Sequence, residues 1–178
     1  MNPQYREGFN PAMPLRCERT LVTFLGDIGP WSKRVVLVGG LVPRYLVGSV
    51  QKGVSPHTGT TDVDLVIRLA VEQDFATYKT LATNLRHSGF EPDQHSYQWS
   101  RQVDRARVTL EFLCETDQVE AGRIYTARQH TGSGFGAVNI PGAQLAARDF
   151  AEVEVKLNAL TAVACQESRS KLPAYSLS

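Results

Sequence analysis

The chain has 178 residues, 42% of them hydrophobic and 21% charged, which are ordinary values for one soluble globular domain. Its formal net charge of +1 gives no reason to expect a broad basic surface for nucleic acid. No apolar run approaches the roughly 18 residues that a membrane helix needs, so we expect no membrane association. The three cysteines lie far apart, with neither zinc nor redox spacing, which favours a reducing, cytoplasmic location.

The apolar runs and turn residues predict an α/β (α+β) fold, in which helices flank a small mixed twisted sheet. We expect a loose arm over 1–13, one domain over 14–165 and a tail over 166–178. The first half should contain a helix over 14–28, a strand over 34–38, a short helix over 41–48, a polar loop over 49–61, a strand over 62–69 and a helix over 71–87. The second half should contain an antiparallel hairpin of strands 96–102 and 107–113, a glycine-rich loop over 132–136, a short strand over 138–140, a helical turn over 144–148, a strand or helix over 153–157 and a helix over 157–165.

Two carboxylates, Asp62 and Asp64, are separated by one residue at the start of a predicted strand, so both side chains point to the same face. Side-by-side like charges repel unless a cation lies between them. A third carboxylate, Glu111, lies inside an apolar strand, where burial is costly unless the group is paired, hydrogen-bonded or bound to a metal. Three converging carboxylates could hold two divalent cations, roughly 3.5–4 Å apart, for phosphoryl chemistry. The simpler alternative is that the two aspartates are solvent-exposed polar residues at the start of a strand.

The pair Gly39-Gly40 ends the first strand and leads into a short helix, where backbone N–H groups can meet a phosphate. Arg44 would lie one turn into that helix and could reach the same phosphate. An equally good alternative is that Arg44 is a solvent-exposed arginine of the helix with no role in binding. Thr60 and Thr61 precede the acids and could hydrogen-bond the phosphate or orient the carboxylates. These five residues are therefore candidates for nucleotide binding.

Three short motifs carry a family resemblance. Val38-Gly39-Gly40, then Thr60-Thr61-Asp62-Val63-Asp64-Leu65, then Leu110-Glu111-Phe112 resemble the signature of the DNA polymerase β-like nucleotidyltransferase superfamily. The Gly-Thr-x-Asp-x-Asp context around the acid pair is similar to that of abortive-infection-type nucleotidyltransferase toxins. The resemblance covers about residues 33–113, with a weaker similarity around residues 144–150.

The resemblance implies a nucleotidyltransferase fold and the transfer of a nucleoside monophosphate from a nucleoside triphosphate to a hydroxyl acceptor. Gly39 and Gly40 would contact the nucleotide phosphates, and Asp62, Asp64 and Glu111 would be the catalytic residues that bind Mg²⁺ (or Mn²⁺). The acceptor would be a protein or an RNA such as a transfer RNA. A member of the toxin group would also have an antitoxin partner.

Two other functions remain open at this stage. One is a non-catalytic module that keeps the nucleotidyltransferase fold and binds a nucleotide or a protein. The helical C-terminal part of the toxin-like relatives, with its functional lysine and aspartate, has no counterpart here, which favours this alternative. The other is a metal-dependent phosphohydrolase, which the lack of a histidine–aspartate metal pattern disfavours.

Overall fold

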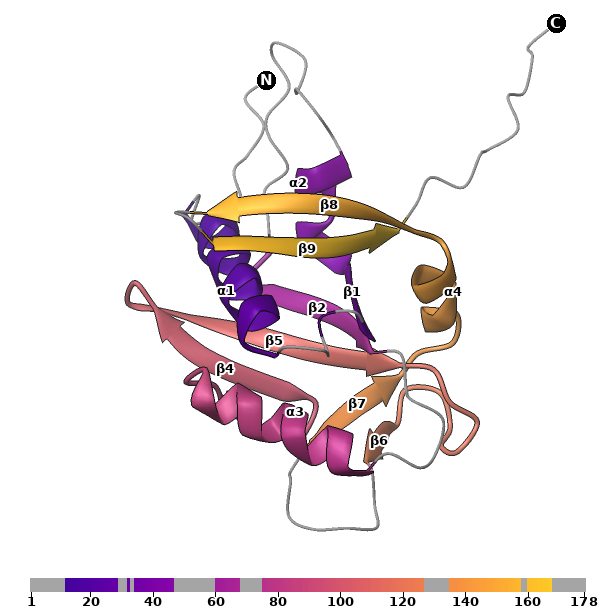
Figure 1. Ribbon diagram of the computed structural model, residues 1–178. Helices are drawn as coiled ribbons and strands as arrows, with labels where there is room; N and C mark the ends of the chain where they lie inside the picture. The colour runs from indigo at the N-terminus through magenta and orange to yellow at the C-terminus, as the bar shows by residue number, and fades with distance from the viewer. Residues whose placement is uncertain are drawn as a thin grey trace, which may run out of the picture.

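The computed structural model describes residues 12–28, 32, 34–46, 60–67, 75–126, 135–157 and 160–167. A mixed β-sheet with helices packed on it forms this part of the chain, which confirms the expected α/β architecture at that level (Figure 1). The helices are α1 (Met13–Asp27), the 3₁₀ turn η2 (Gly39–Leu41), α2 (Pro43–Leu46), α3 (Phe75–His87) and α4 (Ala143–Arg148). The strands are β1 (Val35–Val38), β2 (Asp62–Ile67), β3 (Glu91–Pro92), β4 (Gln98–Val103), β5 (Ala106–Cys114), β6 (Ile124–Thr126), β7 (Gly136–Asn139), β8 (Phe150–Leu157) and β9 (Leu160–Glu167).

The strand order places two strands from distant parts of the chain side by side at the centre. Along the sheet the order is β3-β4-β5-β2-β1-β9-β8, and β7 joins β5 on one side and β6 on the other. Strands β2 and β5 run parallel, whereas β1 is antiparallel to β2 and β4 is antiparallel to β5. A parallel pair needs a crossover connection, and α3 with the β4 hairpin strand supplies it between β2 and β5.

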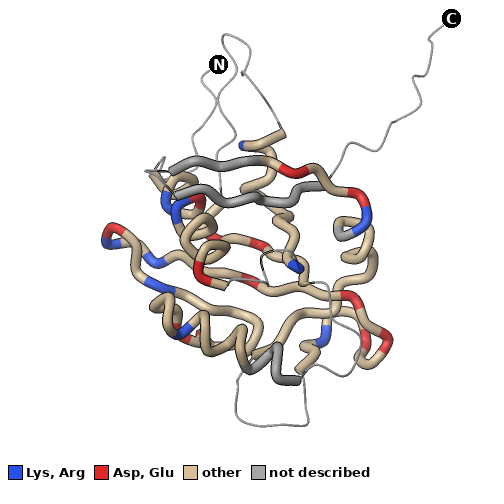
Figure 2. The backbone as a smooth tube through the Cα atoms, in the orientation of Figure 1, with Lys and Arg blue, Asp and Glu red and all other residues tan. Residues whose placement is uncertain are grey.

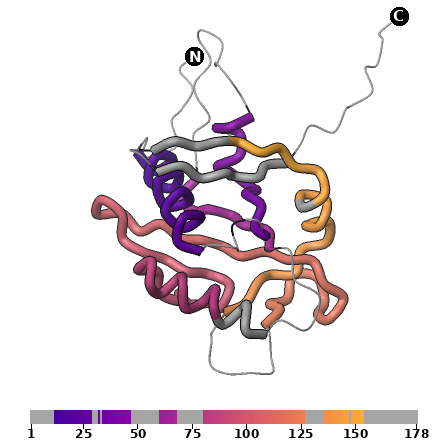
Figure 3. Tube along the Cα trace, viewed as in Figure 1, coloured from indigo at the N-terminus to yellow at the C-terminus, as the bar shows by residue number. Residues whose placement is uncertain are grey.

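The two faces of the sheet are covered unequally. One face packs against α1 and α3 and forms the main core, with residues such as Leu21, Leu85 and Phe112 fully buried. On the opposite face, Ala143 and Ala146 of α4 cover only the apolar patch around Val36 and Val66. Figure 3 shows α4, in orange, well apart from α1 in indigo and α3 in magenta. The face that α4 covers is the one to which the acidic side chains of β2 and β5 belong.

The C-terminal part differs from expectation. Residues 157–165 were predicted to be helical, but Leu157 ends β8 and residues 160–165 lie in β9, so that prediction was wrong for the described residues. Strand β9 pairs with β8 in an antiparallel hairpin from Phe150↔Glu167 to Leu157↔Leu160 and meets β1 at Leu37↔Gln166. Alanine and leucine give this segment a local preference for helix, and long-range pairing with two strands outweighs that preference. Residues 166 and 167 thus belong to a strand, although the expected tail began at 166.

Several smaller differences concern short elements. The helix expected over 41–48 is replaced by the turn η2 and a single turn of α2, and its last two residues lie outside the described residues. The short strands β3 and β6 were not predicted, and Gly136, expected in a loop, begins β7. Most of the predicted arm over 1–13 and loop over 49–61 lies outside the described residues. Within the part of the chain that the structure describes, no helix has both the length and the apolar character needed to cross a membrane.

Candidate functional site

The central strands bring the three predicted acids together. Asp64 lies opposite Glu111 in the parallel register of β2 and β5, and Asp62 lies opposite Thr109, so all three carboxylates share one face. Each acid offers one oxygen atom to a cluster whose members all lie within 4.8 Å of one another. Acidic positions, drawn in red in Figure 2, fall within these two central strands. The acid cluster of Asp62, Asp64 and Glu111 is therefore a product of strand order as well as of side-chain alternation.

The surroundings of Asp64 disfavour its ionised form. Burial raises the pKa of Asp64 to about 6, and the charges of Asp62 and Glu111 add to this effect. A hydrogen bond from the Gly40 backbone N–H acts in the opposite direction, because it favours the ionised form. Burial and the two neighbouring carboxylates thus both disfavour the ionised form of Asp64.

Neighbouring side chains fix two of the three carboxylates. The Thr60 hydroxyl donates a short hydrogen bond to Oδ1 of Asp62, and the Asp62 backbone N–H donates to Thr60 Oγ1 at 3.4 Å. On β4, the Gln98 side-chain amide donates to Oε1 of Glu111 at 2.8 Å. Thr60 therefore orients an acid, one of the two roles considered for it from the sequence, whereas the role of Gln98 was not foreseen.

The two glycines have a steric function that the motif alone does not reveal. Gly39 has a φ of +73°, and a Cβ atom there would overlap the carboxylate of Asp64. A Cβ atom on Gly40 would lie 2.9 Å from Cβ of Thr60. The backbone of η2 therefore approaches the acid cluster more closely than any other residue type would allow. The expected contact of these glycines with phosphate stays a prediction.

Arg44 contacts α1 and not the acid cluster. Its guanidinium forms an ion pair with Glu18 of α1, with Nη2 3.0 Å and Nε 3.1 Å from the same carboxylate oxygen. Only 8% of Glu18 is exposed, so this arginine neutralises a buried charge. A contact between Arg44 and a phosphate would require this ion pair to break.

Asp62 and Glu111 of the acid cluster line a groove of about 360 Å³. Its described lining residues are all polar or charged: Thr61, Asp62, Asp93, Gln94, Gln98, Arg107, Thr109 and Glu111. Of these, Asp93, Gln94, Gln98, Arg107 and Thr109 were not identified from the sequence. Two features of the sequence could have identified three of these residues. Arg107 and Thr109 share the two-residue alternation of Glu111 along the strand. The tight turn at residues 104–105 places Gln98 opposite Glu111 in the hairpin.

The buried cysteines do not supply a nucleophile to this site. The Cys17 thiol of α1 donates to the Thr60 carbonyl at 3.6 Å, and burial, together with the charge of Asp62, raises its pKa to about 11. Burial raises the pKa of Cys114 to about 12. Thiols with such pKa values remain protonated near neutrality, and the thiolate is the reactive form.

Comparisons with protein-family models, with curated proteins and with solved structures find no match for this chain. The function of the protein is therefore inferred from the residues of the site.

Proposed function

We propose that this protein is a metal-dependent nucleotidyltransferase, which moves a nucleoside monophosphate from a nucleoside triphosphate to a hydroxyl acceptor on a protein or an RNA. The observation that carries the proposal is the acid cluster, in which one oxygen each of Asp62, Asp64 and Glu111 lies within 4.8 Å of the others. Two of the three acids, Asp62 and Glu111, line a polar groove on the same sheet face as the apolar patch that α4 covers. Converging carboxylates in an accessible groove suit phosphoryl chemistry better than they suit a purely structural role.

The residues present fit a hard divalent cation. Asp62, Asp64 and Glu111 would hold Mg²⁺ or Mn²⁺, since both ions prefer oxygen ligands and carboxylates in particular. When bound, such an ion neutralises phosphate charge and lowers the pKa of a coordinated hydroxyl. Asp64 also suits a cation ligand, because it is a half-buried carboxylate with the charges of Asp62 and Glu111 beside it.

The chain's own residues would contribute mainly positioning. Thr60 and Gln98 hold Asp62 and Glu111 in fixed rotamers before substrate arrives, which reduces the cost of ordering the site. In the reaction, a bond forms between the acceptor oxygen and the α-phosphorus, and the bond from that phosphorus to pyrophosphate breaks. The proton of the acceptor hydroxyl passes to the Glu111 carboxylate, whose orientation is fixed by Gln98.

The test is nucleotide transfer by purified protein with each labelled triphosphate, Mg²⁺ and a cell extract as the source of acceptor. We expect Glu111→Gln to bind nucleotide within a few-fold of wild type and to lose transfer by roughly 10² or more, the scale of a lost catalytic group. Glu120→Gln is the matched control, because Glu120 is an exposed glutamate outside the groove. If wild type binds a triphosphate and transfers nothing to any fraction, the non-catalytic binding module replaces this proposal.

A further inference from the structure

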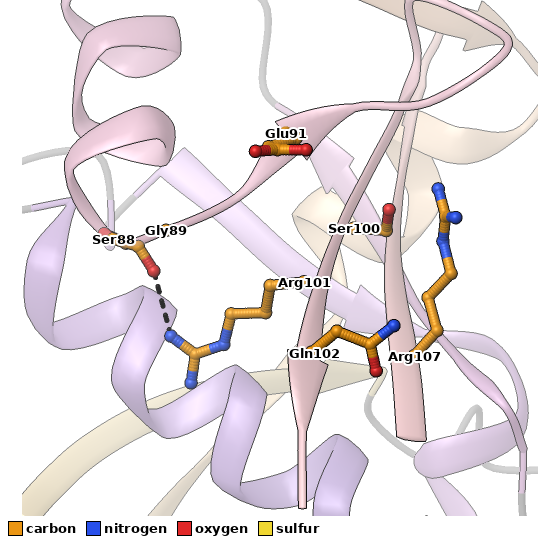
Figure 4. A pocket seen from close by; sticks show the side chains of 7 residues that line it. All are labelled: Ser88, Gly89, Glu91, Ser100, Arg101, Gln102 and Arg107. Atoms are coloured by element: carbon orange, nitrogen blue, oxygen red, sulfur yellow. Dashed lines mark hydrogen bonds between the residues drawn. The ribbon is translucent and has the colours of Figure 1, made fainter. Parts of the chain in front are cut away.

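The groove at the acid cluster does not end at the acids. Arg107 lines that groove and also a second cavity of about 470 Å³, whose other described lining residues are Ser88, Gly89, Glu91, Ser100, Arg101 and Gln102. Figure 4 shows Arg107 and Ser100 on the same side of the β4–β5 hairpin, while Arg101 extends to the Ser88 carbonyl. None of the three acids lines the second cavity, so Arg107 marks the boundary between the two.

Arg107 stands on the same face of β5 as Glu111. Strand residues 107, 109 and 111 share one face, and four residues along a strand span about 13 Å between Cα atoms. Such a separation places Arg107 within reach of a ligand that extends along the groove from the acid cluster. Among the described lining residues of the acid-containing groove, Arg107 is the one basic side chain.

The guanidinium of Arg107 forms an ion pair with a carboxylate. Nη2 of Arg107 lies 2.6 Å from Oδ2 of Asp93, and the arginine side chain remains 55% exposed. The Asp93 side chain is 20% exposed, so only the arginine end of this ion pair lies in solvent. An ion pair with one exposed partner contributes little to stability, and a competing anion can approach the guanidinium from its open side. The ion pair between Arg44 and Glu18 differs, because Glu18 is buried and would be left without its cation.

We propose that Arg107 binds the β- and γ-phosphates of the triphosphate, and that Asp93 occupies the guanidinium only until those phosphates arrive. This inference rests on the proposed function, in which the α-phosphate lies at the acid cluster. A guanidinium presents several N–H donors in a plane and forms paired hydrogen bonds with phosphate oxygens, which suits a polyphosphate tail. Arg107 is thus a substrate-binding residue that recognises the triphosphate, while Arg44 serves the packing of α1.

Calorimetric titration with three probes tests the inference, each in the presence of Mg²⁺: inorganic tripolyphosphate, a nucleoside triphosphate and the matching monophosphate. We expect Arg107→Gln to weaken binding of the first two by about 10- to 100-fold, the scale of hydrogen bonds to a charged group. Binding of the monophosphate should change by less than about twofold. Asp93→Asn should strengthen tripolyphosphate binding by a few-fold, because it removes the competing carboxylate. Arg123→Gln is the matched control, since Arg123 is also an exposed arginine near a carboxylate, 4.0 Å from Glu120, and lies outside both cavities.

Two results would overturn the inference while leaving the proposed function intact. One is wild-type affinity of Arg107→Gln for tripolyphosphate and triphosphate, with wild-type transfer. The other is an equal loss of affinity for triphosphate and monophosphate, which would assign Arg107 to another part of the nucleotide. Failure of the wild-type protein to bind any of the three probes would instead remove the proposed function itself. Thermal melting of each variant verifies folding, and the exposure of Arg107 leads us to expect little change.

Discussion

The acid cluster should make the metal-free protein less stable, and Asp64→Asn isolates this effect. The pKa of Asp64 is raised from 3.8 to about 6 in the folded protein, so folding favours its protonated form. The stabilising contribution of that form is fully present below pH 4 and is lost as the pH rises through 6. Asparagine is neutral at every pH and keeps an oxygen that can accept the hydrogen bond from the Gly40 N–H. The variant should therefore be the more stable protein at neutral pH.

The magnitude follows from the size of the shift. A difference of about two pKa units corresponds to roughly 3 kcal/mol for a fully buried group. Asp64 is only half-buried, and solvent screening reduces the expected gain to about 1–2 kcal/mol above pH 6. In a protein of this length, each kcal/mol shifts the melting temperature by about 2–4 °C.

Denaturant unfolding of wild type and Asp64→Asn between pH 4 and 8, with a chelator present, measures this difference. The two proteins should have similar stability near pH 4 and diverge as the pH rises. Asp93→Asn is a control of opposite sign, because the Gln94 backbone N–H and then Arg107 hold the pKa of Asp93 below its ordinary value. Asp93 therefore stabilises the protein above the acid range, and this contribution is lost as the pH falls through its folded pKa. If Asp64→Asn is destabilised equally at every pH, the ionised Asp64 carboxylate is not disfavoured in the folded protein.

Two further substitutions test how the site is supported. Gly39→Ala should destabilise the protein by at least about 1–2 kcal/mol, because alanine is strained at a φ of +73° and its methyl group overlaps the Asp64 carboxylate. The affinity for magnesium, measured on the same variant, should also fall. Unchanged stability and unchanged affinity would contradict the steric role of this glycine. Arg44→Gln should cost about 1–3 kcal/mol in denaturant unfolding by leaving the buried Glu18 carboxylate without its cation. Adding Glu18→Gln to Arg44→Gln should recover most of that loss, and a double variant no more stable than the single one would show that the ion pair is not the cause.

The elements that carry the acids were predictable because their signals are local. The apolar run after Asp62 and Asp64 identified β2, and the alternation of Val108, Leu110 and Phe112 identified β5 with Glu111 on its polar face. Their direct pairing depends on strand order, which no periodicity encodes. The C-terminal strand β9 was missed for a related reason, since its pairing with β8 and β1 overrides a local preference for helix.

The supporting residues of the site were harder to foresee. Gln98 reaches Glu111 only through the hairpin register, and that register depends on a two-residue turn in which Asp104 and Arg105 both have positive φ. Positive φ is uncommon for residues other than glycine, so a turn could be predicted at these positions but not its type. Arg44 was selected by its distance along the chain from the glycines, whereas burial of Glu18 on α1 decides where its side chain points.

Binding of a divalent cation by Asp62, Asp64 and Glu111 can be measured by titration with Mn²⁺ followed by electron paramagnetic resonance. Binding removes the sharp signal of the free ion, so affinity is measured without any assumption about substrate or acceptor. We expect wild type to bind Mn²⁺, and the double variant Asp62→Asn/Asp64→Asn to lose this binding while remaining folded. Equal Mn²⁺ binding by wild type and the double variant, or no binding by wild type, would contradict a cation site at these three acids.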